Sequence, residues 1–162
     1  IYAYGFKKFH EDALKAGADG ILNLDLPPDE ESINNELSEA NKLLNIRIIA
    51  PTTPPERISK ITETGRGFIY YISREGVTGA RTELAEGIGE QVKLIKGYTS
   101  LPVVVGFGIS TPEHSAEVAK VADGVVVGSA IVKRIAQHSD ASDLCGKVYD
   151  FVKPLVDAAK SV

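Results

Sequence analysis

The chain has 162 residues, a typical length for one domain with an apolar core. Apolar residues make up 43% of it and charged residues 25%, as in an ordinary globular protein, and the net charge of −4 argues against nucleic acid or an acidic membrane surface as a partner. The single cysteine, Cys145, excludes an internal disulfide, and with no signal segment and no apolar run of about 20 residues we expect a cytoplasmic protein without a membrane span.

Five short apolar segments, rich in valine and isoleucine, recur along the chain. They cover residues 20–25, 46–50, 68–72, 102–106 and 124–128. Most do not alternate polar with apolar residues, which is typical of parallel strands covered on both faces. Each segment between two of them is long enough for a crossover helix. The sequence therefore predicts an α/β protein, a single domain over residues 1–162, in which five strands alternate with helices and one helix follows the last strand.

Several helix starts and faces can be predicted from local signals. Thr53 and Glu56 have the spacing of a capping box, and the segment 110–113 (STPE) predicts a second capped start. The segment 143–162 predicts a last helix that Pro154 starts or kinks. An apolar stripe between the third and fourth strands comprises Leu84, Ile88, Val92 and Ile95.

Two strands end in glycine and run directly into a predicted helix, at 103–110 (VVVGFGIS) and 125–130 (VVVGSA). If both corners lie at one end of the sheet, their backbone N–H groups and helix N-termini together favour a phosphate dianion. Consecutive corners of this kind hold the substrate phosphate in many (β/α)₈ barrels. Each of Gly106, Gly108 and Gly128 has the alternative role of permitting a tight turn. Phe107 is either a wall of the pocket or a core residue.

Three other features are candidates for a site. The loop 76–79 (GVTG) offers N–H groups and the Thr78 hydroxyl, with a simple surface turn as the alternative. Asp25 ends the predicted strand 20–25, where it is a general base, a hydrogen-bonding partner or a loop cap. Tyr70 and Tyr71 alternate along their strand, so one faces inward and the other faces the helices. No metal site is predicted, and the histidines are expected to be ordinary helix residues.

The number of strands raises a topological question. A closed (β/α)₈ barrel needs eight strands and roughly 250 residues. Five strands cannot close such a barrel. The chain is therefore predicted to be either an open sheet of another topology or the latter part of a barrel without its first three strands.

Taken together, these residues resemble the alpha subunit of tryptophan synthase, from the first residue to the last helix. The matching pieces are 25–28 (DLPP), 50–54 (APTTP), 73–74 (SR) with 76–80 (GVTGA), 105–110 (VGFGIS) and 128–132 (GSAIV). Five pieces in one order and at compatible spacing make the resemblance specific. It implies the C-terminal portion of a TIM (β/α)₈ barrel, with five parallel strands and outer helices.

The resemblance also implies a reaction and a set of site residues. The family is a lyase of tryptophan biosynthesis that cleaves indole-3-glycerol phosphate to indole and glyceraldehyde 3-phosphate by a retro-aldol reaction. The alpha subunit has no cofactor of its own, and pyridoxal phosphate belongs to the beta subunit, its partner. By resemblance, the residues that contact the substrate phosphate are Gly79, Gly108, Gly128 and Ser129. Those of the indole pocket and the active-site loop are Leu22, Asp25, Tyr70, Thr78 and Phe107, with no role assigned to Asp25.

The resemblance places both catalytic carboxylates of the family on segments before the first residue of this chain. No catalytic residue is therefore predicted here, and the chain is expected to be inactive alone. Glu75 is the nearest acid in the active-site loop, but nothing assigns it the missing role. Two alternatives stay open: another phosphate-binding TIM-barrel lyase, isomerase or epimerase, and a non-catalytic assembly fragment whose unpaired strand edges pair with a second copy.

Overall fold

The computed structural model describes residues 1–24, 26, 31–73, 81–106 and 108–162. Five strands form one parallel sheet in which each strand pairs with the next one in sequence. The strands are β1 (Gly20–Leu22), β2 (Leu44–Ile49), β3 (Ile69–Ile72), β4 (Val103–Gly106) and β5 (Gly124–Val126). The helices are α1 (Phe6–Lys15), α2 (Ser32–Ala40), α3 (Pro55–Glu63), α4 (Arg81–Lys96), α5 (Pro112–Ala119), α6 (Ser129–Gln137) and α7 (Leu144–Lys160).

All five predicted strands exist, in the predicted order and all parallel. The first and last are shorter than predicted, since β1 ends at Leu22 and β5 ends at Val126. Two helices, α6 and α7, follow β5, where the predicted alternation has one. None of the helices in the described part of the chain is both long enough and apolar enough to cross a membrane.

The core lies between the middle of the sheet and helices α3, α4 and α5. On β3 the side chains alternate, so that Ile69 and Tyr71 are buried against the helices while Tyr70 faces the other way and is half-buried. The predicted stripe of α4 is confirmed for Ile88, Val92 and Ile95, which join this core. Burying such side chains, at about 1.5–3 kcal/mol each, is what holds the helix layer on the sheet.

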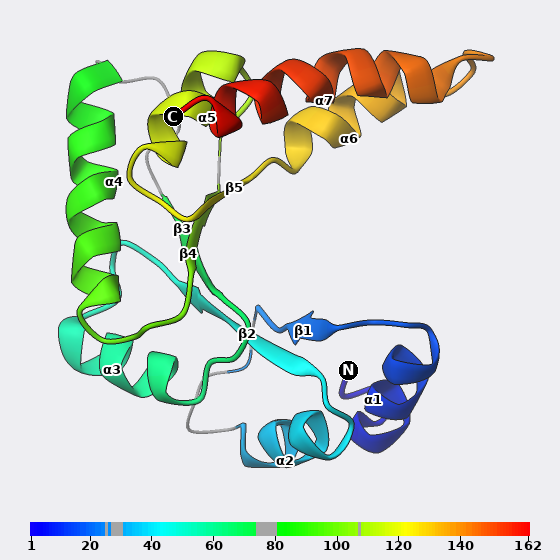
Figure 1. Ribbon diagram of the computed structural model, residues 1–162. Helices are drawn as coiled ribbons and strands as arrows, with labels where there is room; N and C mark the ends of the chain where they lie inside the picture. Colours follow the sequence, from blue (N-terminus) through cyan, green and yellow to red (C-terminus); the bar gives the residue numbers. More distant parts are fainter. Residues whose placement is uncertain (25, 27–30, 74–80, 107) are drawn as a thin grey trace.

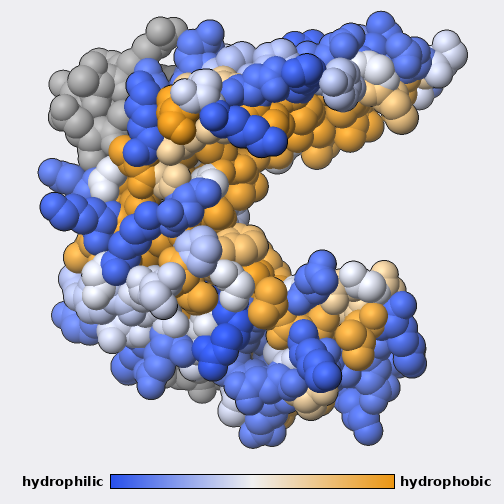
Figure 2. All heavy atoms as spheres, in the orientation of Figure 1, coloured by the Kyte–Doolittle hydropathy of each residue, from blue (hydrophilic) through white to orange (hydrophobic). Residues whose placement is uncertain are grey.

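In the part of the chain that the structure describes, helices do not cover the opposite face of the sheet in the same way. Figure 1 shows α6 and α7 beyond the last strand, β5, and α1 and α2 beside the first strands, β1 and β2. The molecule therefore has the outline of a C. In the space-filling view the gap between these two ends is open and lined largely by apolar residues (Figure 2). The five strands therefore curve without closing.

The predicted helix starts have mixed outcomes. The capping box at Thr53 is wrong: α3 begins at Pro55, and the Thr53 hydroxyl accepts a hydrogen bond of 3.1 Å from the Ala50 amide in the turn after β2. The second start is confirmed, since Thr111 caps α5 by accepting from the His114 amide at 3.3 Å. Pro154 lies inside α7 and does not start it. It is exposed, so water can satisfy the carbonyl group that lacks its N–H donor.

His10 is the one histidine with more than an ordinary helix role. It is fully buried between α1 and α2. Its Nδ1 donates to the Phe6 carbonyl at 2.7 Å, and its Nε2 lies 3.3 Å from the Ser38 hydroxyl. This pair joins α1 to α2.

A charged cluster on the surface of α1 gives a prediction about pH. The carboxylate of Asp12 accepts hydrogen bonds from Lys8 and Tyr4, which lower its pKa to about 2. A lowered pKa means that the cluster stabilises the fold above the ordinary aspartate pKa and loses this contribution as the pH falls toward 2. In an NMR titration of the Asp12 carboxyl carbon, Lys8→Met should raise the measured pKa toward its ordinary value. Lys7→Met, whose partner is Glu11, should leave it unchanged.

Candidate functional site

The two glycine corners, after β4 and after β5, lie side by side at the carboxyl end of the sheet. β4 and β5 pair in parallel, with Gly106 opposite Val126, so their carboxyl ends point the same way. Adjacent strands are about 4.8 Å apart, which brings the chain segments that follow them within reach of one small anion. The structure thus supports the predicted arrangement of two neighbouring strand–helix corners.

The two corners differ in what they offer a ligand. At the first, Gly108 has a positive φ of 80°, a conformation that favours glycine, and it is exposed. The helix that follows is already capped by the Thr111 side chain, so part of its N-terminus is occupied. The first corner therefore offers mainly its loop.

The second corner offers an open helix N-terminus. Gly128 is the N-cap residue of α6 and has no side chain to cap it, and its carbonyl accepts from Ile131 and Val132. The first residues of a helix have no intrahelical acceptor for their N–H groups. Gly128 and Ser129 are exposed, and within the described residues, apart from its own helix and chain neighbours, no atom lies within 4 Å of the place where a Cβ of Gly128 would be. Of the two helices, α6 is therefore the better site for an anion.

Tyr70 and Leu22 lie on the face of the sheet that looks into the gap. A Cβ at Gly106 would come within 2.6 Å of the Tyr70 ring, so glycine is required there by close packing. Leu22 is 43% exposed on the first strand. The structure thus brings Tyr70 close to the first glycine corner, while Leu22 lies three strands away on β1. The other four predicted site residues, Asp25, Thr78, Gly79 and Phe107, lie outside the described residues.

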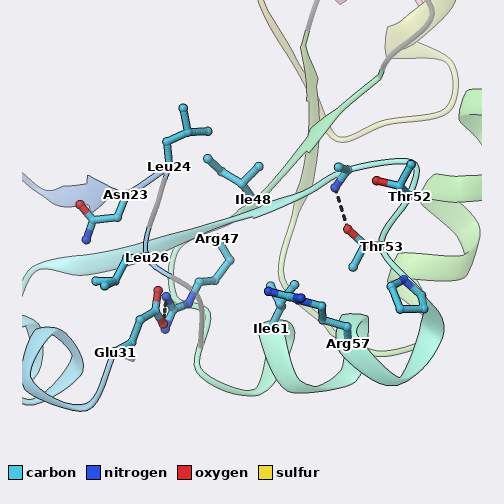
Figure 3. Close-up of a pocket in the computed structure, with 12 residues that line it drawn as sticks. Asn23, Leu24, Leu26, Glu31, Arg47, Ile48, Thr52, Thr53, Arg57 and Ile61 are labelled. Carbon is cyan, nitrogen blue, oxygen red and sulfur yellow. Dashed lines mark hydrogen bonds and ion pairs between the residues drawn. The ribbon is translucent and has the colours of Figure 1, made fainter. Parts of the chain in front are cut away.

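A cavity of about 530 Å³ opens where β1 stops pairing with β2. β2 continues beyond its pairing with β1, and the cavity lies between this free part and the segment after β1. Figure 3 shows Leu24 and Ile48 on one side of β2 and the Glu31 and Arg47 side chains meeting on the other. Thr52 and Arg57 lie farther along the same cavity. It lies at the carboxyl end of the sheet, as do the glycine corners.

A buried ion pair forms the polar wall of this cavity. Glu31 and Arg47 contact each other with only 1% and 5% of their side chains exposed. The Arg47 guanidinium also donates to Asn35 at 2.9 Å and to Thr64 at 2.8 Å. The pair therefore joins the segment before α2 to the sheet and to the end of α3. The sequence analysis did not predict this ion pair. Arg47, in the middle of an apolar strand, is the residue that indicates it, because a buried charge requires a partner.

Within the described residues, no group of three or more His, Cys, Asp or Glu side chains is arranged to hold a metal ion.

Comparison with known proteins identifies the family. The family model described as "Tryptophan synthase alpha chain" matches residues 1–160. The chain belongs to the tryptophan synthase alpha chain family. The alpha chain of Opitutus terrae is 49% identical over 138 residues, and that of Geotalea uraniireducens is 43% identical over all 162. These matches cover 52% and 60% of the two relatives, so this chain spans little more than half of their length.

Solved tryptophan synthase alpha structures have the same fold. The subunit alpha of Legionella pneumophila str. Paris superposes with a TM-score of 0.86 at 33% identity, over 100% of this chain and 60% of that one. The subunit alpha of Campylobacter jejuni gives a TM-score of 0.85 at 31% identity, over 96% of this chain and 60% of that one. The five-stranded sheet is therefore part of a TIM barrel, and the alternative of an open sheet of another topology is not favoured. The family match likewise does not favour another barrel isomerase or epimerase.

Proposed function

We propose that this chain supplies the phosphate-binding part of a tryptophan synthase alpha-type lyase, which cleaves indole-3-glycerol phosphate to indole and glyceraldehyde 3-phosphate. The observation that carries the proposal is the parallel pairing of β4 and β5, with the uncapped N-terminus of α6 at its end. An open helix N-terminus combines unpaired amides with the positive end of the helix dipole. Both favour the dianionic end of this substrate.

We assign the phosphate to Gly128 and Ser129 on the α6 side and to Gly108 on the β4 side, with Gly79 as a further contact by family resemblance. Thr111 caps α5, so α6 is the helix whose first amides are open to the phosphate. Tyr70 and Leu22, on the inner face of the sheet, are proposed walls for the indole ring, and the same resemblance adds Phe107, Thr78 and Asp25.

The chemistry itself needs groups that we do not assign to this chain. Retro-aldol cleavage requires a proton to move at the indole ring, and losing one general acid or base costs about 10²–10⁴ in rate. We propose that residues 1–162 alone bind the phosphate end of the substrate without turning it over. No cofactor is proposed for this chain. Pyridoxal phosphate is assigned to the beta subunit, the proposed partner. This chain and the beta subunit are both expected in the cytoplasm.

The test is to add indole-3-glycerol phosphate to the chain and to follow backbone amide shifts and indole release together. The amides of Ser129 and Ala130 should shift, and no indole should form. Ser129→Asp should abolish the shifts, because it places a carboxylate where the dianion binds. Ser142→Asp, which adds the same charge just before α7, should leave them unchanged. Indole release by the chain alone, or unchanged α6 amides, would refute the proposal.

A further inference from the structure

Helix α2 is held on the sheet mainly by polar side chains. The residues that it buries are Asn34 and Ser38, which are 1% and 2% exposed. Glu31, its N-cap residue, is buried in the ion pair shown in Figure 3. Its large apolar side chains contribute less, since Leu37 is half-buried and Ile33 is 58% exposed. Helices α3 and α4 differ from α2, because they bury isoleucine and valine in the core.

The polar side chains of α2 have partners on three other elements. The side-chain amide of Asn23, just after β1, donates to Asn34 Oδ1 at 3.2 Å. The side-chain amide of Asn45, on β2, donates to Asn35 Oδ1 at 2.6 Å. Polar contacts thus join α2 to α1, to the end of β1 and to β2. We call these contacts the polar layer; it comprises Glu31–Arg47, Asn34–Asn23, Asn35–Asn45 and Ser38–His10.

The polar layer is not fully satisfied. Asn34 Nδ2 and Asn45 Oδ1 are buried and have no hydrogen-bond partner among the described residues. A cavity of about 80 Å³, lined in part by Ser38, Asn45 and Thr64, has room for water beside the layer. Separating a polar contact exchanges it for hydrogen bonds to water, so each contact contributes little net stability. Separating the ion pair likewise returns both charges to water, and their hydration offsets much of the lost attraction.

The sequence of α2 makes it a weak helix by itself. It has nine residues, SINNELSEA, of which two are asparagine and two are serine. These residue types have low helix propensity, and isolated helices shorter than about 12–15 residues are marginal in water. The N-cap residue forms no side-chain hydrogen bond that would cap the helix. α2 should therefore lose its helical hydrogen bonds whenever it leaves the sheet, while β1 and β2 keep their backbone pairing.

We propose that α2 is a displaceable helix, which leaves the sheet as one unit while the strands and helices α3, α4 and α5 stay folded. The displacement takes Glu31 away from Arg47 and so removes one wall of the cavity of about 530 Å³ at the carboxyl end of the sheet. The fold thus contains a device that opens this cavity from the side of α2. The inference rests on the packing of α2 and not on the phosphate site.

The experiment is native-state hydrogen exchange of the chain, followed by NMR at several low urea concentrations. The amides of Asn35, Ser38 and Asn41 should share one free energy of opening, because they are released together. They should exchange more than about tenfold faster than the amides of Val92 and Ile95 in α4. Their exchange should also depend less on urea, since displacing one helix exposes less surface than global unfolding. Helix α3, which also has nine residues, is the internal control and should exchange with α4.

Two variants test whether the polar layer is the reason. The double variant His10→Phe/Ser38→Ala replaces one buried polar contact by an apolar one and should slow exchange in α2 more than about threefold. Ser32→Ala makes the same serine-to-alanine change at an exposed position of α2 and should change this exchange less than about twofold. Protection of the α4 amides shows in each case that the variant is folded.

Three results would overturn the proposal. The first is exchange of the α2 amides with the same free energy and the same urea dependence as the α4 amides, which would mean that α2 opens only with the whole fold. The second is a different free energy for each α2 amide, which would indicate fraying of the helix. The third is faster exchange of α2 in the double variant, which would make the polar layer the stronger way of holding this helix.

Discussion

Arg47→Met is expected to lower the free energy of unfolding by about 3–5 kcal/mol, because it leaves the buried Glu31 carboxylate without its cation. The variant also leaves Asn35 and Thr64 without the donor that now reaches both of them. Urea denaturation followed by circular dichroism measures the loss. An effect of this size would unfold a substantial fraction of a marginally stable domain.

Two controls separate the ion pair from a general effect of removing an arginine. The double variant Glu31→Gln/Arg47→Met removes both charges and should recover a large part of the loss. Arg66→Met removes an exposed arginine that lies 4.0 Å from Glu39 and donates to the backbone carbonyls of Glu63 and Gly65, and it should cost less than the loss of the buried cation. If Arg47→Met cost no more than Arg66→Met, the buried pair would have no role in stability.

Gly106→Ala is expected to destabilise the chain by about 1–3 kcal/mol, because its methyl group would overlap the Tyr70 ring. The ring must then move on the inner face of the sheet, next to the first glycine corner. Urea denaturation gives the energy, and the NMR signals of the Tyr70 ring report the displacement. The substitution should therefore change both stability and the shape of the proposed indole wall.

The same substitution in α4 provides the matched control. Gly87 is exposed in the helix, and outside the backbone of its own helix no atom of the described residues lies within 4 Å of its added Cβ. Gly87→Ala should stabilise the chain by up to about 1 kcal/mol, since alanine has the higher helix propensity. A loss of stability in Gly87→Ala, or none in Gly106→Ala, would contradict the packing argument.

Sequence patterns predicted the five strands and their order, because buried parallel strands form apolar runs bounded by glycine and by helix caps. They also predicted that Tyr70 and Tyr71 face opposite sides, since the strand period is two. The capping box at Thr53 failed for a local reason. Pro55 at the first helical position starts α3 two residues after Thr53, and the threonine hydroxyl closes a turn instead.

The candidate site was predicted only in part. The two corners after β4 and β5 could be located from their glycines, and the cap of α5 could be predicted from the segment 110–113. The uncapped start of α6 was found only in the structure. The Glu31–Arg47 contact joins residues that are distant in sequence, so no local spacing indicates it. The required glycine at 106 likewise depends on a side chain from the neighbouring strand.

The strict succession of strands has a consequence for biosynthesis. Among the described strands none is inserted between two earlier ones, so each strand after β1 pairs with the strand made immediately before it. A nascent chain leaving the ribosome can therefore extend the sheet one unit at a time, without opening a pairing already formed. Short loop closures of this kind keep the entropy cost of each step small.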